Sequence, residues 1–90
     1  MVKKNVKIIN KHGLHARPAT VLVTHASRFE SDIFITYKEM RVNAKSILGV
    51  LVLAVEPGAE ITFEADGKDE EKAIEKLLDL TRNKFYTEQL

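Results

Sequence analysis

Alternation of apolar and polar residues predicts four β-strands along the chain. They cover residues 3–9, 32–37, 40–43 and 60–66. Lys38 and Glu39 form a two-residue turn between the second and third strands, although the usual Asn-Gly signal of such hairpins is missing. The last strand alternates cleanly, which gives it one buried and one solvent-exposed face. Such a strand suits an antiparallel sheet that helices cover on one side only.

Helical spacing of apolar residues predicts three helices, over residues 16–27 and 46–53 and from Asp69 towards the C-terminus. Asp69 is expected to cap the third helix, and a firm turn at residues 56–58 precedes the fourth strand. The apolar stripe of the third helix comprises Ile74, Leu77, Leu78, Thr81 and Phe85. The order βαββαβα predicts an open-faced α/β sandwich of the α+β class. The order of strands within the sheet does not follow from the pattern alone.

Length, charge and composition narrow the function. The chain has 90 residues, which allow a single domain over 1–90 with a small core. Its formal net charge of +1 argues against a nucleic-acid-binding protein, which usually carries a strong basic excess. No apolar run approaches the roughly 20 residues needed to cross a bilayer, so we expect no membrane insertion. The absence of cysteine excludes thiol chemistry and makes a cytoplasmic protein the natural expectation.

Residues 13–19 gather chemistry-bearing groups at the start of the first predicted helix. Gly13 allows a tight turn, and Pro18 tolerates the first helical turn because N–H groups there have no intrahelical acceptor. If the helix starts at Ala16, His15 is its N-cap residue. A histidine at this place is either a plain capping or loop residue or part of an anion-binding site.

The neighbours of His15 favour a phosphate site. The backbone N–H groups of Ala16 and Arg17 point out of the helix end and can bind an anion. A neutral imidazole is a nucleophile towards phosphoryl groups, and the helix N-terminus together with Arg17 disfavours the protonated ring. The same N–H groups and Arg17 would then hold the phosphoryl oxygens. We therefore expect His15 to accept a phosphoryl group.

The predicted helix over 46–53 is apolar all round, although it has barely two turns. Complete burial is one explanation. A short helix over an open sheet usually keeps one side exposed, so we expect Ile47, Leu48 and Leu51 to form an exposed patch for partner docking. Ser46 is the predicted N-cap, and this role by itself requires no further function.

Two segments carry a family resemblance. They are Gly13-Leu14-His15-Ala16-Arg17-Pro18-Ala19 and Lys45-Ser46-Ile47-Leu48-Gly49-Val50-Leu51. They resemble the active-site and regulatory-serine motifs of the HPr family, the histidine-containing phosphocarriers of the sugar phosphotransferase system. The resemblance implies the HPr fold, with a four-stranded antiparallel sheet in the order 1-4-2-3 and three helices on one face.

The same resemblance implies the reaction. His15 would take a phosphoryl group on Nδ1 from Enzyme I and pass it to Enzyme IIA domains, and the group would originate in phosphoenolpyruvate. A carrier of this kind is a covalent intermediate without turnover of its own, and it needs no cofactor. We expect this carrier to be a monomer.

Partners and regulation follow from the resemblance as well. It implies a docking surface at Thr20, Ile47, Leu48 and Leu51, and methionine is common in the family where Leu48 and Leu51 stand. Family members with this Lys-Ser-Ile-φ-Gly pattern are commonly phosphorylated at the residue that matches Ser46 by HPr kinase/phosphorylase. They then bind catabolite control protein A. The alternative function is a regulatory HPr-like binding protein that acts mainly through phospho-Ser46 and a transcriptional regulator.

The remaining histidines and cations have less specific interpretations. His12, His15 and His25 lack a cysteine or a nearby acidic residue that would complete a metal site, so we expect no metal. His12 either tunes the pKa of His15 or crowds the phosphoryl group, and the sequence leaves both open. Four basic residues are expected to form a loose positive field for acidic partners: Lys11, Arg17, Arg28 and Lys45.

Overall fold

The computed structural model describes residues 1–88 and contains a four-stranded antiparallel sheet in the order β1-β4-β2-β3. The strands are β1 (Val2–Lys7), β2 (Asp32–Tyr37), β3 (Met40–Asn43) and β4 (Glu60–Asp66). The helices are α1 (Ala16–Ala26), α2 (Ile47–Leu53) and α3 (Glu70–Arg82), and a short 3₁₀ turn, η1 (Lys84–Tyr86), follows α3. The predicted βαββαβα order is confirmed, and so is the strand order 1-4-2-3.

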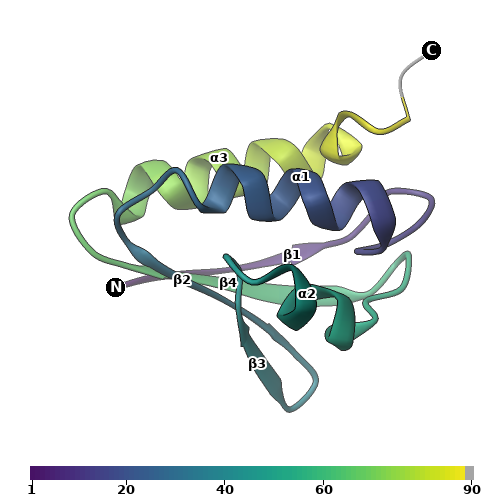
Figure 1. The fold of residues 1–90 in the computed structure, drawn as a ribbon, viewed down its shortest axis with the longest axis horizontal. Helices are drawn as coiled ribbons and strands as arrows, with labels where there is room; N and C mark the ends of the chain where they lie inside the picture. The colour runs from purple at the N-terminus through teal and green to yellow at the C-terminus, as the bar shows by residue number, and fades with distance from the viewer. Residues whose placement is uncertain (89–90) are drawn as a thin grey trace.

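The helices cover one face of the sheet and leave the other open (Figure 1). α1 and α3 lie side by side above the sheet, and α2 packs against α1 and β3. α2 runs antiparallel to α1. Just before α2 begins, Lys45 Nζ donates to the carbonyl of Phe29, beyond the end of α1, at 2.7 Å. Just after α2 ends, the carbonyl of Val55 accepts the backbone N–H of Leu14, ahead of α1, at 3.0 Å.

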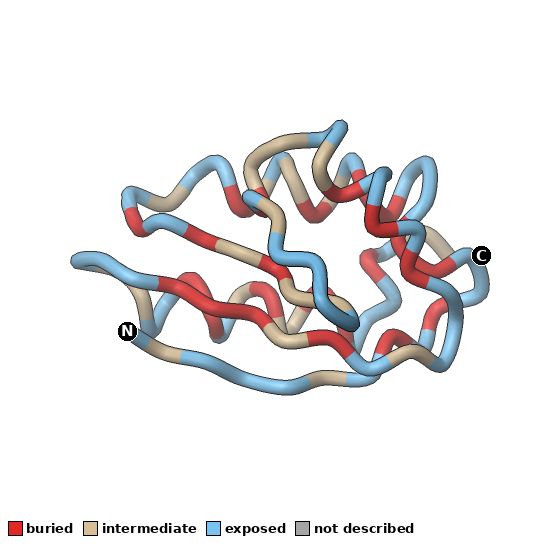
Figure 2. Tube along the Cα trace, turned by 90° about the horizontal axis from the view of Figure 1, so that it is seen from below, coloured by how far each residue is buried: buried red, intermediate tan, exposed pale blue. Residues whose placement is uncertain are grey.

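The hydrophobic core lies between the sheet and the helix layer, and it appears as the buried stretches of both layers in Figure 2. Ile35 of β2 pairs with Phe63 of β4, and both side chains are fully buried. Leu22 of α1 and Leu77 of α3 close over them from the helix layer. Complete burial of one such side chain stabilises the fold by about 1.5–3 kcal/mol. No helix within residues 1–88 combines the length and the apolar character that crossing a membrane requires.

The first strand is shorter than the alternation predicts, because the regular ladder with β4 ends at Lys7 opposite Glu60. Beyond the ladder, the N–H of Ile8 still donates a hydrogen bond to the carbonyl of Ala59 at 2.8 Å. Ile8 is buried and Ile9 is exposed, so the inward and outward alternation persists beyond the strand. The chain thereby leaves the sheet and enters the loop that leads to α1.

The prediction of one solvent-exposed face on β4 is wrong at Glu64, which is buried on the open side of the sheet. Arg41 of β3 reaches across β2 and donates a 2.6 Å hydrogen bond to the Glu64 carboxylate. Its guanidinium lies 3.7 Å from the centre of the Phe34 ring, in cation–π contact. The hydrogen bond from Arg41 lowers the pKa of Glu64. The buried carboxylate is therefore held in its charged form.

Asp69 occupies the predicted N-cap position of α3, but its side chain does not cap that helix. The carboxylate instead accepts hydrogen bonds from the backbone N–H of Glu30 and from both the N–H and the hydroxyl of Ser31. These bonds, led by that from the Ser31 hydroxyl, lower the pKa of Asp69 to about 2. Asp69 therefore fastens the segment before β2 to the start of α3. Phe85, expected at the end of the third helix, is buried in η1.

Candidate functional site

The loop after β1 delivers His15 to the start of α1, and Gly13 fixes how closely this loop approaches the body of the protein. Gly13 has φ +61°, and a Cβ atom there would lie 2.1 Å from the carbonyl oxygen of Val55. No other residue type fits this position without moving the backbone. The next residue, Leu14, is fully buried and donates its N–H to that same carbonyl. The loop therefore rests directly on the chain that follows α2.

Asn10 supports the loop from inside. Its side chain is completely buried, and its Nδ2 donates a 2.7 Å hydrogen bond to the carbonyl of Gly13. The backbone N–H of Gly13 in turn donates to the carbonyl of Asn10 at 3.4 Å. Asn10 was not among the residues predicted to contribute to the site. Asparagine is a common turn former, but nothing in the local pattern indicates that this one is buried.

His15 is the N-cap residue of α1, as predicted, and has an extended backbone with φ −115° and ψ 157°. Its exposed side chain makes no capping hydrogen bond, so the ring is not tied to the helix end. Ala16 has φ +49°, in the left-handed region that L-residues rarely adopt. Regular helical backbone therefore begins only after the first residue assigned to α1. Ala16 and Arg17 are exposed, and the first turn of α1 has no acidic residue to compete for its N–H groups.

A small hollow of about 290 Å³ adjoins the start of α1. It is lined by His12, Ala16, Arg17, Pro18 and Thr87. Ala16 and Arg17, the residues expected to bind an anion, therefore border open space at the helix end. The hollow also brings His12 near the candidate site, as its position in the sequence suggested.

The C-terminal residues of the described chain pack against the site. Phe85 is fully buried, and η1 contacts α1. Farther along, the carboxylate of Glu88 accepts a hydrogen bond from the backbone N–H of Lys11 in the loop before His15. The apolar stripe of the third predicted helix includes Phe85, whereas no sequence pattern indicates the contact that Glu88 makes with the His15 loop.

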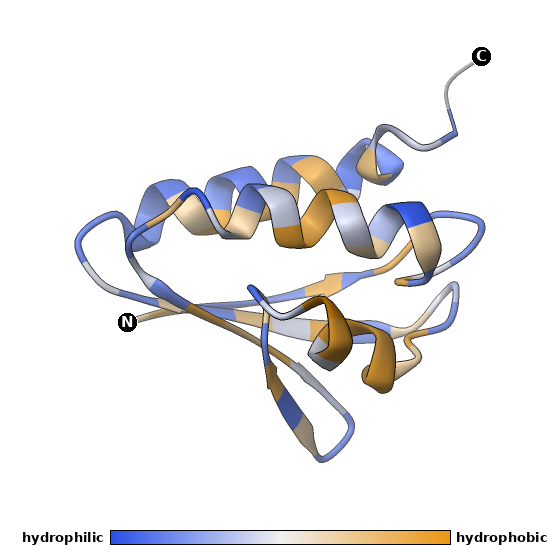
Figure 3. Ribbon diagram, in the orientation of Figure 1, coloured by the Kyte–Doolittle hydropathy of each residue, from blue (hydrophilic) through white to orange (hydrophobic). Residues whose placement is uncertain are grey.

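α2 is hydrophobic along most of its length (Figure 3), and several of its apolar side chains are exposed to solvent. Leu48 is 73% exposed, and Ile47 and Leu51 are 38% and 36% exposed. Complete burial of this helix is therefore wrong, and the predicted exposed patch is present. Val52, which is 64% exposed, enlarges the patch and was not predicted. Ser46 caps α2 as expected, because its hydroxyl accepts the N–H of Gly49 at 3.1 Å.

The four cations predicted to act together are divided between the two ends of α1. Lys11 and Arg17 lie in the His15 loop and at the helix start, and both are exposed. Arg28 follows the other end of α1, where it lies 3.4 Å from Nδ1 of His25. Lys45 is held at that same end by its bond to the Phe29 carbonyl. The predicted field therefore reduces to two cations near the site.

The three histidines are not brought together. His12 and His15 precede α1, whereas His25 lies in its last turn. Burial and the nearby charges of Arg28 and Lys76 lower the pKa of His25. Within residues 1–88, no three His, Cys, Asp or Glu side chains gather in a metal-binding group.

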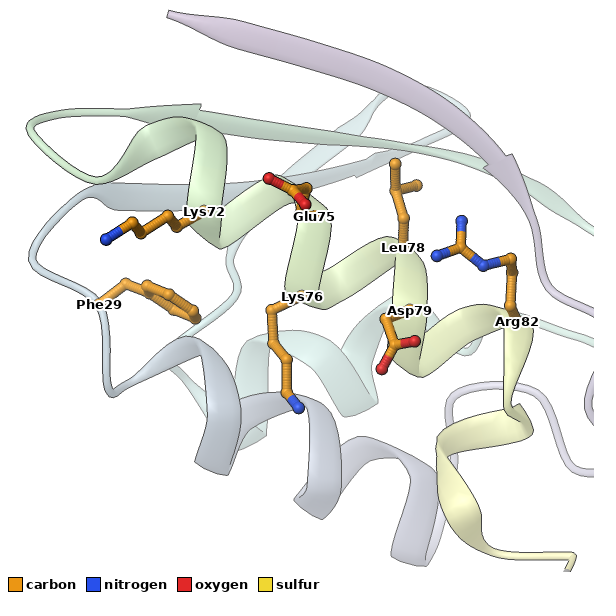
Figure 4. Close-up of a pocket in the computed structure, with 7 residues that line it drawn as sticks. All are labelled: Phe29, Lys72, Glu75, Lys76, Leu78, Asp79 and Arg82. Atoms are coloured by element: carbon orange, nitrogen blue, oxygen red, sulfur yellow. The ribbon is translucent and has the colours of Figure 1, made fainter.

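A second, larger hollow of about 500 Å³ runs along α3 (Figure 4). Its lining residues are Phe29, Lys72, Glu75, Lys76, Leu78, Asp79 and Arg82. Positive and negative side chains alternate along it, and in Figure 4 they point in several directions rather than towards one point. Because charges of both signs are mixed along the hollow, it offers no site of one sign that would attract a charged ligand.

Comparison with known proteins identifies the class of protein. The family model described as "PTS HPr component phosphorylation site" matches residues 2–83. The phosphocarrier protein HPr of Treponema pallidum is 44% identical over 88 residues, which cover 98% of this chain and all of that protein. The HPr-like protein Crh of Bacillus subtilis is 49% identical over 77 residues, covering 86% of this chain and 91% of that protein.

Solved structures agree with these relatives. HPr-C-His from Thermoanaerobacter tengcongensis superimposes with a TM-score of 0.95 at 45% identity, over 99% of this chain and 100% of that one. HPr from Bacillus anthracis gives 0.87 at 45% identity, over 89% and 95%. Fold and relatives together define a small phosphocarrier protein. The chain belongs to the HPr family of the sugar phosphotransferase system. It acts as a phosphoryl carrier of that system, with partners such as Enzyme I and Enzyme IIA.

Proposed function

We propose that His15 is the residue that carries the phosphoryl group. The observation that supports this most directly is its exposed ring at the N-cap of α1, which makes no hydrogen bond with the helix that it precedes. Nδ1 of the neutral ring would attack the phosphorus of phospho-Enzyme I. The new N–P bond forms as the bond from phosphorus to Enzyme I breaks. Transfer to Enzyme IIA repeats the exchange with His15 as the donor, so the carrier returns to its starting state.

Arg17 and the backbone N–H groups of Ala16 and Arg17 would hold the transferred phosphoryl oxygens. All three groups belong to the first turn of an eleven-residue helix, where N–H groups lack intrahelical acceptors and the helix dipole favours negative charge. The guanidinium adds charge-assisted hydrogen bonds. The chain then supplies only the carried group and its cradle. The parts that make transfer fast come from each partner, so we assign no independent catalytic turnover to the carrier.

The experiment that tests His15 uses phosphoenolpyruvate and Enzyme I, and the other two histidines provide matched controls. We expect one acid-labile, alkali-stable phosphate on the wild type and on His12→Ala and His25→Ala, but none on His15→Ala. Phosphate retained by His15→Ala would exclude His15 as the acceptor. Arg17→Ala should slow transfer without loss of folding, because the side chain is exposed. Arg28→Ala removes the same charge at the far end of α1 and should leave the rate unchanged.

We further propose that partners dock on the apolar patch of α2, formed by Ile47, Leu48, Leu51 and Val52, together with Thr20 of α1. Continuous exposed apolar side chains favour a protein partner. Thr20 is exposed, and its hydroxyl donates to the carbonyl of Ala16 at 3.3 Å, so it lies one helical turn after the proposed phosphoryl site. A footprint that joins Thr20 to α2 would bring a partner's reacting group to His15.

Ser46 is the proposed site of regulatory phosphorylation by an HPr kinase/phosphorylase, after which catabolite control protein A would bind. The resemblance to the HPr-like protein Crh, which solved structures describe as a catabolite repression protein, supports this second role. The test is acid-stable phosphate formed with ATP and the kinase on the wild type but not on Ser46→Ala. Incorporation by Ser46→Ala would assign the modification elsewhere and leave Ser46 with its capping role.

We propose a cytoplasmic, single-domain protein over 1–90 that works as a monomer. The family match over 2–83 supports one HPr domain. Some relatives form dimers, including an HPr dimer from Thermoanaerobacter tengcongensis and the Crh dimer. Light scattering at several protein concentrations distinguishes the two states. A mass of 10.2 kDa throughout supports the monomer, and twice that value excludes it.

A further inference from the structure

The peptide group between Gly13 and Leu14 is held at both of its polar atoms. Its carbonyl oxygen accepts the 2.7 Å hydrogen bond from Asn10 Nδ2, and its N–H donates to the Val55 carbonyl at 3.0 Å. The Asn10 side chain and the Leu14 side chain are both completely buried. This peptide group is therefore fixed in orientation as well as in position.

His15 is the residue after Leu14, so one buried residue separates it from this peptide group. On its other side, Pro18 and Ala19 anchor the first turn of α1 in the protein interior. The exposed ring of His15 thus extends from a short link between two fixed points. Only one of the two bonds to the peptide comes from a side chain, and that side chain is Asn10. Nδ2 makes the sole hydrogen bond of the amide within residues 1–88, because Oδ1 has no protein partner there.

We propose that Asn10 is a positioning residue for phosphoryl transfer: by holding the Gly13 carbonyl, it sets the direction in which His15 meets the phosphorus of its partner. The inference rests on His15 being the acceptor. Transfer requires the attacking nitrogen to approach in line with the bond that breaks, and a misplacement of about 1 Å can cost up to a hundredfold in rate. Without the bond from Asn10, the peptide group is held only by the Leu14 N–H bond to Val55, so it can tilt about that single bond and the direction of the ring is less well fixed.

The test measures steady-state transfer from Enzyme I, with this protein as the varied substrate. For Asn10→Ala we expect kcat to fall by roughly ten- to a hundredfold with KM unchanged, because the docking patch on α2 is intact. Thr81→Ala is the matched control. It removes another buried side-chain bond to a backbone carbonyl, that of Leu77, outside the loop. It should lower stability and leave kcat unchanged. Asn10→Ala with wild-type kcat, or Thr81→Ala with an equal loss, would overturn the proposal.

Asn10→Asp is a second test, because aspartate has nearly the same shape as asparagine. Burial raises the pKa of a carboxyl group, and the protonated acid can donate its O–H to the Gly13 carbonyl. Its kcat relative to wild type should therefore rise as pH falls from 8 to 6, and a ratio that does not change with pH would contradict the role. The final amount of phosphate separates the two proposals. Slow variants that still reach one phosphate on His15 support both, whereas wild type phosphorylated elsewhere overturns the assignment of His15 itself.

Discussion

Replacement of Gly13 by alanine should destabilise the protein, because the His15 loop packs against the Val55 carbonyl at this residue. The new Cβ would lie 2.1 Å from the Val55 carbonyl oxygen, well inside van der Waals contact. The loop must therefore move away, which breaks the hydrogen bond from the Leu14 N–H to that carbonyl. In addition, alanine would have to adopt φ +61°, in the left-handed region.

Two contributions set the magnitude. A left-handed φ costs a residue with a Cβ about 1 kcal/mol. Loss of a buried hydrogen bond that leaves a carbonyl unpaired costs about 1–3 kcal/mol. Together these costs come to about 2–4 kcal/mol. The smaller entropy of an unfolded chain with alanine offsets about 0.4–1 kcal/mol of this loss. The free energy of unfolding should therefore fall by about 1–3.5 kcal/mol, which lowers Tm by about 5–28 °C in a domain of this size.

Gly58→Ala is the matched control, because Gly58 has φ +87° and its Cβ would meet nothing within 4 Å. It carries the conformational cost and the unfolded-state offset but not the collision, so its Tm should fall by less than about 8 °C. Thermal unfolding followed by circular dichroism measures both variants. Equal losses of stability in the two variants would show that the close contact between Gly13 and Val55 adds no cost to the alanine substitution. The description of the loop given above would then be wrong.

Three further predictions concern stability and docking. The folded-state pKa of Asp69 is about 2, below the ordinary value of 3.8, so its stabilisation is complete above about pH 4 and is lost as the pH falls through 2. Asp69→Asn should remove that part of the acid dependence in urea unfolding at stepped pH. Ala54, at the end of α2, has φ +51°, and Ala54→Gly should raise the urea midpoint by an amount equivalent to about 0.5–1 kcal/mol. A lower midpoint would contradict this. Leu48→Ala should raise the KM of Enzyme I for this protein, because it removes part of the docking patch. Its Tm should be unchanged, because Leu48 is 73% exposed.

Sequence patterns predicted the features that depend on neighbouring residues alone, such as strand bounds and helix caps. Alternation placed β3 and β4 at their observed bounds, and the predicted N-cap at Ser46 makes its expected bond to Gly49. The His15 region was predictable because the glycine, the histidine, the arginine and the proline are consecutive in the chain. The N-cap position of His15 depends only on a helix starting at the next residue. The motif needs no tertiary contact to be recognised.

Features that depend on which segments meet in space could not be predicted. Glu64 is buried because Arg41, 23 residues earlier, reaches it across an intervening strand, and strand order does not follow from alternation. Asp69 bonds to Ser31 rather than capping α3, since the loop before β2 offers better donors. The importance of Asn10 arises from its complete burial under a loop, which no local periodicity encodes.

The antiparallel packing of α2 on α1 places Ser46 and His15 at opposite ends of the helix layer. Seven residues at about 1.5 Å each give α2 a length of roughly 10 Å, which is well within a normal protein–protein footprint. A partner that covers the exposed side of α2 and also reaches the start of α1 would contact the surroundings of both residues. Groups attached at the two ends do not need to touch each other within the free chain. Under the proposed roles of the two residues, each group would alter the surface that a bound partner must match, so any coupling between them would arise when the partner docks.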